Sequence, residues 1–247
     1  GGWDYLTIDT SAERLYVSRG TRVQVVDLVN DSIAGEIGHT NGVHGIALAA
    51  GKGYTSNGRD SSVTVFDLST LKTLAVIKID ARNPDAIFFE PSSRRIFTFN
   101  GGSSNATAID VESGTVVGTV PLPGKPEFAV GDGKGTVYVN IEDKNALVAF
   151  DARTLKVIYT APLAPGEEPT GLAIDQVDHR LYSVCHNKTM VILDSDSGRI
   201  VTTLPIGEGV DAAAYDPASH LIFSSNGKGT LTIVRESSPQ EFAVAET

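Results

Sequence analysis

Six polar residues recur at intervals of 40 to 43 residues in this chain of 247 residues, each leading into a short apolar segment. Carboxylates that gather at one place repel one another, which raises some pKa values or recruits a cation. Brought together by the fold, these residues would form a pocket for a cationic ligand or, without the threonine, a site for Ca²⁺ or a similar metal. The other interpretation is that each side chain only hydrogen-bonds the backbone of its own turn. The six residues are Asp4, His44, Asp85, Glu127, Thr170 and Asp211.

A second polar set lies about thirteen to seventeen residues further along most of the repeats, in segments such as SNGRD, FNGGS and SNGKG. Asparagine before glycine is a tight-turn signature, because asparagine tolerates positive φ. The alternative is a ligand surface made of Asn57, Asn100, Asn140, Asn187, Asn226 and Arg59. Basic residues accompany the asparagines, and they are either solvated or form a rim for an anionic ligand. These are Arg19, Arg22, Arg59, Lys144, Lys188 and Lys228.

Catalytic motifs are missing from the sequence. It has no G-x-S-x-G elbow, no phosphate-binding loop of the Walker type, no H-E-x-x-H and no C-x-x-C. Cys185 and His186 are adjacent, but neighbouring strand residues point to opposite sides, so a buried structural cysteine is expected. Trp3 is expected to anchor the core, with stacking on a ligand as the alternative. We therefore assign no catalytic residue.

The elements that position these residues are repeats of about 42 residues. Apolar runs that end in aspartate, such as VQVVD, VTVFD and MVILD, recur at 40 to 43 residue intervals, and a sixth run, LTIVR, ends in arginine. A second marker, seen in RLYVS, KGYTS and RLYSV, places an aromatic residue upstream of each run. Two markers with one period indicate a repeat architecture. The aromatic residues are Tyr16, Tyr54, Phe97, Tyr138, Tyr182 and Phe223.

Each repeat contains four short segments rich in Val, Ile, Thr, Tyr and Phe, separated by turn residues. Four antiparallel strands joined by hairpin turns make one blade of a β-propeller. The sequence thus predicts an all-β fold in a single domain of six blades. We place the repeats at about 1–40, 41–80, 81–122, 123–164, 165–206 and 207–247.

Segments such as RLYVSRGTRVQVVDL and GYTSNGRDSSVTVFDLSTLKTLAVIKI resemble the YVTN repeats of YncE-like β-propeller proteins along the whole chain. The resemblance implies a bacterial, commonly exported protein, hence a periplasmic or extracellular location, and often seven blades. Six visible repeats leave two interpretations, an incomplete seven-bladed ring or a closed six-bladed one. An open ring would expose strand edges and favour association, whereas otherwise we expect a monomer.

Charge and hydrophobicity restrict the partners. The formal net charge is -10, and this field disfavours nucleic acid as a partner. No apolar run of eighteen residues occurs, so we expect no membrane span, and the chain opens with GGWD in place of a basic segment followed by an apolar run, so we expect no retained signal peptide. A single cysteine allows no disulfide within the chain.

Two functions are consistent with the sequence. The first is a non-catalytic scaffold that binds a protein or small-molecule ligand on the face formed by the turns leading into the first strands. The second is an enzyme resembling propeller lactonases, in which the carboxylates hold a divalent metal that polarises an ester. The resemblance predicts the fold and does not choose between these functions.

Overall fold

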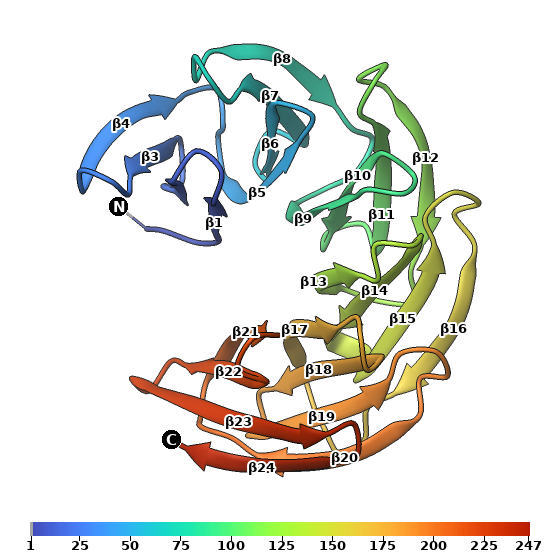
Figure 1. Cartoon of the computed structure of the whole chain (residues 1–247). Helices are drawn as coiled ribbons and strands as arrows, with labels where there is room; N and C mark the ends of the chain where they lie inside the picture. The colour runs from blue at the N-terminus through green and yellow to red at the C-terminus, as the bar shows by residue number, and fades with distance from the viewer. Residues whose placement is uncertain (1) are drawn as a thin grey trace. The chain divides into compact units, whose positions relative to one another are not determined.

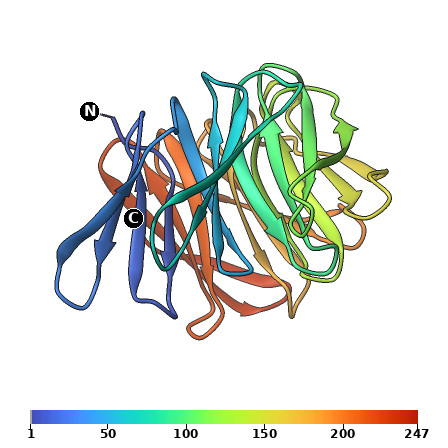
Figure 2. The ribbon, with the colours of Figure 1, turned by 90° about the horizontal axis from the view of Figure 1, so that it is seen from above.

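The structure is a computed structural model that describes residues 2–247, and it contains six four-stranded antiparallel sheets (Figure 1). In every sheet the strands pair in chain order, so each strand neighbours the next one along the sequence. Each sheet lies within one of the predicted repeats. Because neighbouring strands are antiparallel, the turns alternate between the two ends of a sheet (Figure 2). The prediction of an all-β fold built from four-stranded repeats is confirmed.

The chain folds into two compact units, Gly1–Pro121 and Leu122–Thr247, each with three sheets. The first sheet of unit 1 consists of β1 (Leu6–Asp9), β2 (Arg14–Ser18), β3 (Val23–Asp27) and β4 (Ser32–Ile37). The second consists of β5 (Val43–Ala49), β6 (Lys52–Asn57), β7 (Ser62–Asp67) and β8 (Thr73–Lys78). The third consists of β9 (Pro84–Glu90), β10 (Arg95–Asn100), β11 (Asn105–Asp110) and β12 (Val116–Pro121).

Unit 2 has the same organisation. Its first sheet consists of β13 (Pro126–Gly131), β14 (Thr136–Ile141), β15 (Ala146–Asp151) and β16 (Val157–Pro162), with the 3-10 helix η1 (Glu142–Lys144) between β14 and β15. The next consists of β17 (Pro169–Asp175), β18 (Arg180–Cys185), β19 (Thr189–Asp194) and β20 (Ile200–Pro205). The last consists of β21 (Val210–Asp216), β22 (Leu221–Asn226), β23 (Thr230–Ser238) and β24 (Glu241–Glu246).

The aspartate that marks the first five repeats caps the turn after the third strand. Asp67 Oδ1 accepts bonds from the Ser69 hydroxyl at 2.7 Å, the Thr70 N–H at 2.7 Å and the Thr70 hydroxyl at 2.8 Å. These donors favour the ionised form and lower the pKa of Asp67 to about 2. Four residues after the marker the backbone enters the left-handed region, with φ of 59° at Leu71. The same cap is made by Asp27, Asp110, Asp151 and Asp194.

The sixth repeat lacks this cap, because Arg235 stands where the other repeats have aspartate. Its third strand, β23, accordingly continues past that position to Ser238. Glu236, the residue after Arg235, therefore belongs to the strand, and it is buried like the equivalent residues Val111, Ala152 and Ser195. This departure from the repeat positions a carboxyl group inside unit 2.

Apolar side chains from neighbouring sheets form the core of each unit. In unit 1, Tyr16 and Val25 of the first sheet pack with Ile46 and Phe66 of the second. In unit 2, Tyr182 belongs to a cluster between the last two sheets. The aromatic marker is buried in five repeats and half-buried at Phe223. Burial of these large side chains is the main favourable contribution to sheet packing.

First strands of consecutive sheets are neighbours within each unit. In unit 1, β5 lies against both β1 and β9, and in unit 2, β17 lies against both β13 and β21. Figure 1 shows β1, β5 and β9 next to one another. Residues that lead into the first strands therefore come close together inside a unit, although about 40 residues of sequence separate them.

Candidate functional site

The predicted site residues share one position in the repeat. In five sheets the pairing of the first two strands shifts at a β-bulge, and the predicted residue lies at that bulge. In the second sheet Val43 pairs with Asn57 and Ile46 pairs with Thr55, so His44 lies inside the shift. Bulges re-aim side chains and are frequent beside functional sites. Asp4 holds the corresponding place just before β1.

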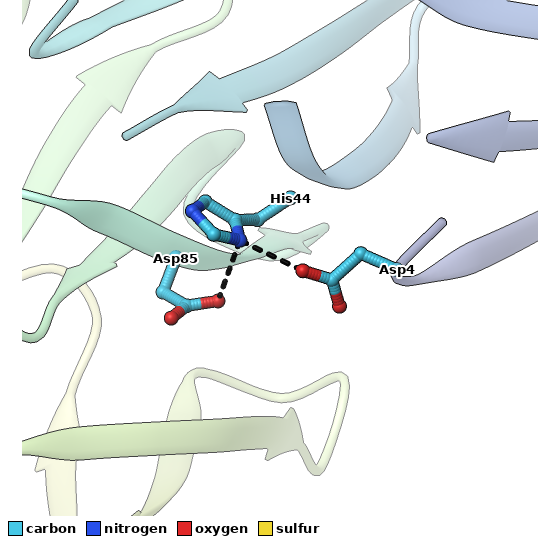
Figure 3. A group of neighbouring side chains, drawn as sticks. All are labelled: Asp4, His44 and Asp85. Carbon is cyan, nitrogen blue, oxygen red and sulfur yellow. Dashed lines mark hydrogen bonds and ion pairs between the residues drawn. The ribbon is translucent and has the colours of Figure 1, made fainter. Parts of the chain in front are cut away.

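Three of these residues, all in unit 1, converge (Figure 3). The His44 Nδ1 atom lies 2.7 Å from Asp4 Oδ2 and 3.6 Å from Asp85 Oδ1. His44 and Asp85 are partly buried, and Asp4 is more exposed. An imidazole between two carboxylates from different sheets forms a compact site, which we call the acid–imidazole site.

Buried serines fix the backbone of this site. The Asp4 N–H donates to Ser18 Oγ at 3.1 Å, and the Gly45 N–H donates to Ser56 Oγ at 2.9 Å. The Ser56 hydroxyl in turn donates to the carbonyl oxygen of Asp85. Because Ser56 links the segments that carry His44 and Asp85, it holds two of the three side chains at a fixed separation.

The donor atoms of the acid–imidazole site fit a small divalent metal. All three residues offer ligand atoms within 4.8 Å of one another. Metal–ligand bonds of about 2.0 to 2.1 Å imply that neighbouring ligand atoms lie roughly 2.9 to 3.4 Å apart. The distances from His44 Nδ1 to Asp4 and Asp85, 2.7 and 3.6 Å, lie on either side of this range. A mixed nitrogen and oxygen set suits zinc-like metals, whereas Ca²⁺ prefers oxygen ligands alone.

The predicted residues of unit 2 have other surroundings. Glu127 pairs with the Lys125 ammonium at 2.6 Å, and Lys125 also pairs with Glu142. The Thr170 side chain is buried, with its hydroxyl 3.4 Å from the carbonyl oxygens of Val184 and Val210. Asp211 is exposed. Unit 2 therefore does not bring these three residues into a cluster like that of unit 1.

Four of the predicted asparagines are buried. Asn57 Nδ2 donates to Thr64 Oγ1 at 2.9 Å, and its Oδ1 accepts from the Thr55 hydroxyl at 2.8 Å. The Asn57 carbonyl oxygen accepts the Asp60 N–H at 3.2 Å, so Asn57 begins the tight turn that the sequence indicates, but the positive φ of this turn falls on Ser61 and not on Asn57. The amides of these four asparagines are hydrogen-bonded inside the sheets, so they do not belong to the candidate site. The four residues are Asn57, Asn100, Asn140 and Asn226.

Asn187 is exposed and hydrogen-bonds the loop before β17, through the Pro165 carbonyl at 2.7 Å and the Glu167 N–H at 3.1 Å.

Most of the predicted basic residues form ion pairs with nearby carboxylates, such as Lys188 with Glu208 at 3.0 Å. The same holds for Arg22 with Glu36 and for Lys144 with Asp143. Arg59 is exposed in the turn after β6. These pairs offset the positive charge that an anion would need.

Two further predictions have clear outcomes. Cys185 is fully buried, and burial raises the pKa of its thiol to about 12, which confirms the structural role. Trp3 is 70% exposed, so the prediction of a core anchor is wrong. It precedes β1 by three positions and the described sheets do not cover it.

The sequence prediction missed a second cluster, formed in unit 2 by Asp175, Asp178 and Glu236. A signal for it exists in the repeat. The residue after the marker position is Leu28, Leu68, Val111, Ala152 or Ser195 in the first five repeats and Glu236 in the sixth. A carboxyl group at a position that is otherwise apolar or small indicates a special environment.

The stacked four-stranded sheets, with their first strands adjacent, place the chain among β-propeller proteins. The fold aligns with a chain of the crystal structure of the mitotic checkpoint complex with a TM-score of 0.85 and 14% identity, covering 98% of this chain and 76% of that one. In sequence, the chain is similar to the uncharacterized protein YncE of Salmonella typhi and of Salmonella typhimurium. Each match is 25% identical over 185 residues and covers 68% of this chain.

The match spans only about half the length of these curated relatives, 52%. No family model matches the chain. Among residues 2–247, no helix has the length and apolar character needed to cross a membrane.

Proposed function

We propose that the protein is a non-catalytic β-propeller binding module whose ligand site is the acid–imidazole site of unit 1. Its first ligand is a divalent cation of the zinc class, held by Asp4, His44 and Asp85. The bound cation then presents free coordination positions to a small-molecule or protein ligand. The similarity to YncE supports a YVTN-repeat propeller in the periplasm or outside the cell.

The observation that carries the proposal is the position of His44 Nδ1, 2.7 Å from Asp4 and 3.6 Å from Asp85. A neutral imidazole and two carboxylates offer three donors to one point. The Nδ1 lone pair can hold either a proton shared with Asp4 or a metal ion, so metal binding displaces that proton. An organic ammonium group gains less here, because it cannot use the imidazole as a coordinating ligand.

Binding of Zn²⁺ by the metal-stripped protein tests the proposal by calorimetric titration. Removing one of three ligands in His44→Ala should cost more than the roughly 10- to 100-fold in affinity that loss of an outer-shell partner costs. The matched control is His186→Ala, because His186 Nδ1 pairs with a single carboxylate, Glu168, at 3.3 Å. We expect wild-type affinity in the control.

Failure of the wild-type protein to bind Zn²⁺, or equal binding by His44→Ala and wild type, would overturn the proposal. Preference for Ca²⁺ over Zn²⁺ at this site would contradict the role of the imidazole, since Ca²⁺ takes oxygen ligands.

Metal-dependent hydrolysis is the second candidate. Three protein ligands with open positions are typical of catalytic zinc, which polarises a carbonyl and activates water. Zinc-dependent hydrolysis of a lactone that disappears in Asp85→Asn would favour an enzyme. Zinc binding without hydrolysis would support the non-catalytic binding module instead of the enzyme.

A further inference from the structure

Three carboxyl groups meet between the last two sheets of unit 2, at the opposite ends of the strands from the predicted ligand positions. Asp175 ends β17, Asp178 lies in the turn to β18, and Glu236 belongs to β23. Each offers an oxygen within 4.8 Å of the others. Asp175 is 2% exposed and Glu236 is 4% exposed. Two of the three carboxyl groups are therefore almost completely removed from water.

Tyrosine hydroxyls and backbone amides hold two of these carboxyl groups. The Tyr182 hydroxyl donates to Glu236 Oε2 at 2.7 Å, and the Tyr215 hydroxyl donates to Asp175 Oδ2 at 2.9 Å. Asp175 Oδ1 accepts the Val177 N–H at 2.7 Å. These hydrogen bonds fix the orientation of both carboxyl groups without neutralising their charge.

The second oxygen of Glu236 is different. Glu236 Oε1 is buried and has no hydrogen-bond partner among residues 2–247. A buried acceptor without a partner costs about 1 to 3 kcal/mol, and more when it is charged. The side chain is held by Tyr182, so Oε1 cannot turn to find a donor without giving up that bond. A ligand at Oε1 would remove this cost.

No positive side chain offsets the cluster. Within the described part of the chain, no ion pair involves Asp175, Asp178 or Glu236. Arg180 is the nearby cation in this sheet, and its guanidinium bonds Asp194 at 3.1 Å and the Pro239 carbonyl at 2.6 Å.

A cavity of about 240 Å³ adjoins the cluster. Asp178, Glu236 and His220 line it together with Ser237, Ser238 and Pro239. The His220 Nδ1 atom lies 3.2 Å from the Tyr215 hydroxyl, which keeps that nitrogen engaged. The cavity therefore gives a small ion and its water molecules access to oxygen donors.

We propose that Asp175, Asp178 and Glu236 form a binding site for a Ca²⁺-class divalent cation that enters from this cavity. Three carboxylates make an all-oxygen set, which hard cations prefer, and Ca²⁺ completes its six to eight ligands with water. The unpartnered Glu236 Oε1 supplies one ligand. This site differs from the acid–imidazole site in its residues, its donor chemistry and its unit.

Thermal unfolding of the chelator-treated protein with and without Ca²⁺ tests the site. At a Ca²⁺ concentration of about 100 times Kd, we expect the Tm to rise by roughly 5 to 10 °C. Glu236→Gln keeps the size of the side chain and an acceptor for Tyr182 and removes the charge. Its Ca²⁺-free form should be at least as stable as wild type, and its Tm should not respond to Ca²⁺.

Asp178→Asn is a second variant. It changes the turn residue and preserves the two buried carboxyl groups. It should raise the Ca²⁺ concentration needed for the same increase in Tm at least tenfold. His44→Ala should keep the full response, which separates this site from the zinc site. An unchanged Tm of wild type in Ca²⁺, or an equal rise in Glu236→Gln, would overturn the proposal. Loss of the response in His44→Ala would overturn it as well.

Discussion

The Tyr182 hydroxyl donates a hydrogen bond of 2.7 Å to Glu236 across 54 residues of sequence, and so links the last two sheets through a buried carboxyl group. In the first sheet Tyr16 occupies the equivalent position, yet its buried hydroxyl has no hydrogen-bond partner in the described chain. The tyrosine at this position of the repeat is therefore hydrogen-bonded in the fifth repeat and, among the described residues, has no partner for its hydroxyl in the first.

Tyr182→Phe should destabilise the protein by about 1.5 to 3 kcal/mol, because it removes a hydrogen bond to a buried carboxyl group and leaves Glu236 Oε2 without its donor. Tyr16→Phe is the matched control. It removes a buried hydroxyl without a partner, so stability should stay the same or increase. Urea unfolding of both variants gives the comparison. Equal destabilisation by the two substitutions would contradict the role of the Tyr182 hydroxyl.

Acid stability should depend on the turn aspartates. The Ser69 hydroxyl and the Thr70 amide and hydroxyl lower the pKa of Asp67 to about 2, so the folded state favours the ionised carboxylate. A lowered pKa contributes stability that is present above the unfolded value of 3.8 and is lost as the pH falls toward 2. Asp67→Asn should therefore reduce stability near neutral pH and flatten its decline between about pH 4 and pH 2.

Unfolding free energies of wild type and Asp67→Asn as a function of pH measure this effect. Asp211→Asn is the control, because Asp211 is exposed and no turn cap depends on it. The control should follow the wild-type curve. A difference between wild type and Asp67→Asn that stays constant down to pH 2 would contradict the proposed linkage.

The sequence predicts the repeat because its markers have physical roles that recur from sheet to sheet, with the aspartate cap present in the first five. The aspartate of the marker closes a turn, and the aromatic residue fills the space between sheets, so both positions are constrained by the blade itself. Alignment of the repeats also predicts that Asp4, His44 and Asp85 approach one another, since equivalent positions on adjacent first strands are neighbours. Periodicity therefore carries information about distance in space.

Other parts of the site depend on interactions that a linear pattern does not contain. Asn57 precedes glycine, which indicates a turn, but hydroxyl groups on two strands bind its amide inside the sheet. Glu236 interrupts the repeat, and it is buried because the position after the marker lies between sheets, as Val111, Ala152 and Ser195 show by their burial in three other repeats. Both cases require the positions of neighbouring strands. A search for charged residues at repeat positions that elsewhere hold apolar or small residues would have identified Glu236.

Asn57 and Asn187 were both predicted as ligand residues, but the first is buried and the second is exposed. Asn57 is fully buried, and its amide bonds three side chains, Thr55, Ser62 and Thr64. Asn57→Ala should cost about 2 to 4 kcal/mol, because it leaves buried hydroxyl groups without partners and opens a cavity. Asn187→Ala should cost less than about 1 kcal/mol, since the bonds of Asn187 lie at the exposed surface, where water replaces them.

Chemical unfolding of Asn57→Ala and Asn187→Ala, together with Zn²⁺ titration of each, separates stability from binding. Because neither amide belongs to the acid–imidazole site, folded samples of both variants should bind Zn²⁺ as tightly as wild type. Similar stability losses in the two variants would contradict the buried network around Asn57. A loss of Zn²⁺ affinity in folded Asn187→Ala would contradict the assignment of the zinc site to Asp4, His44 and Asp85.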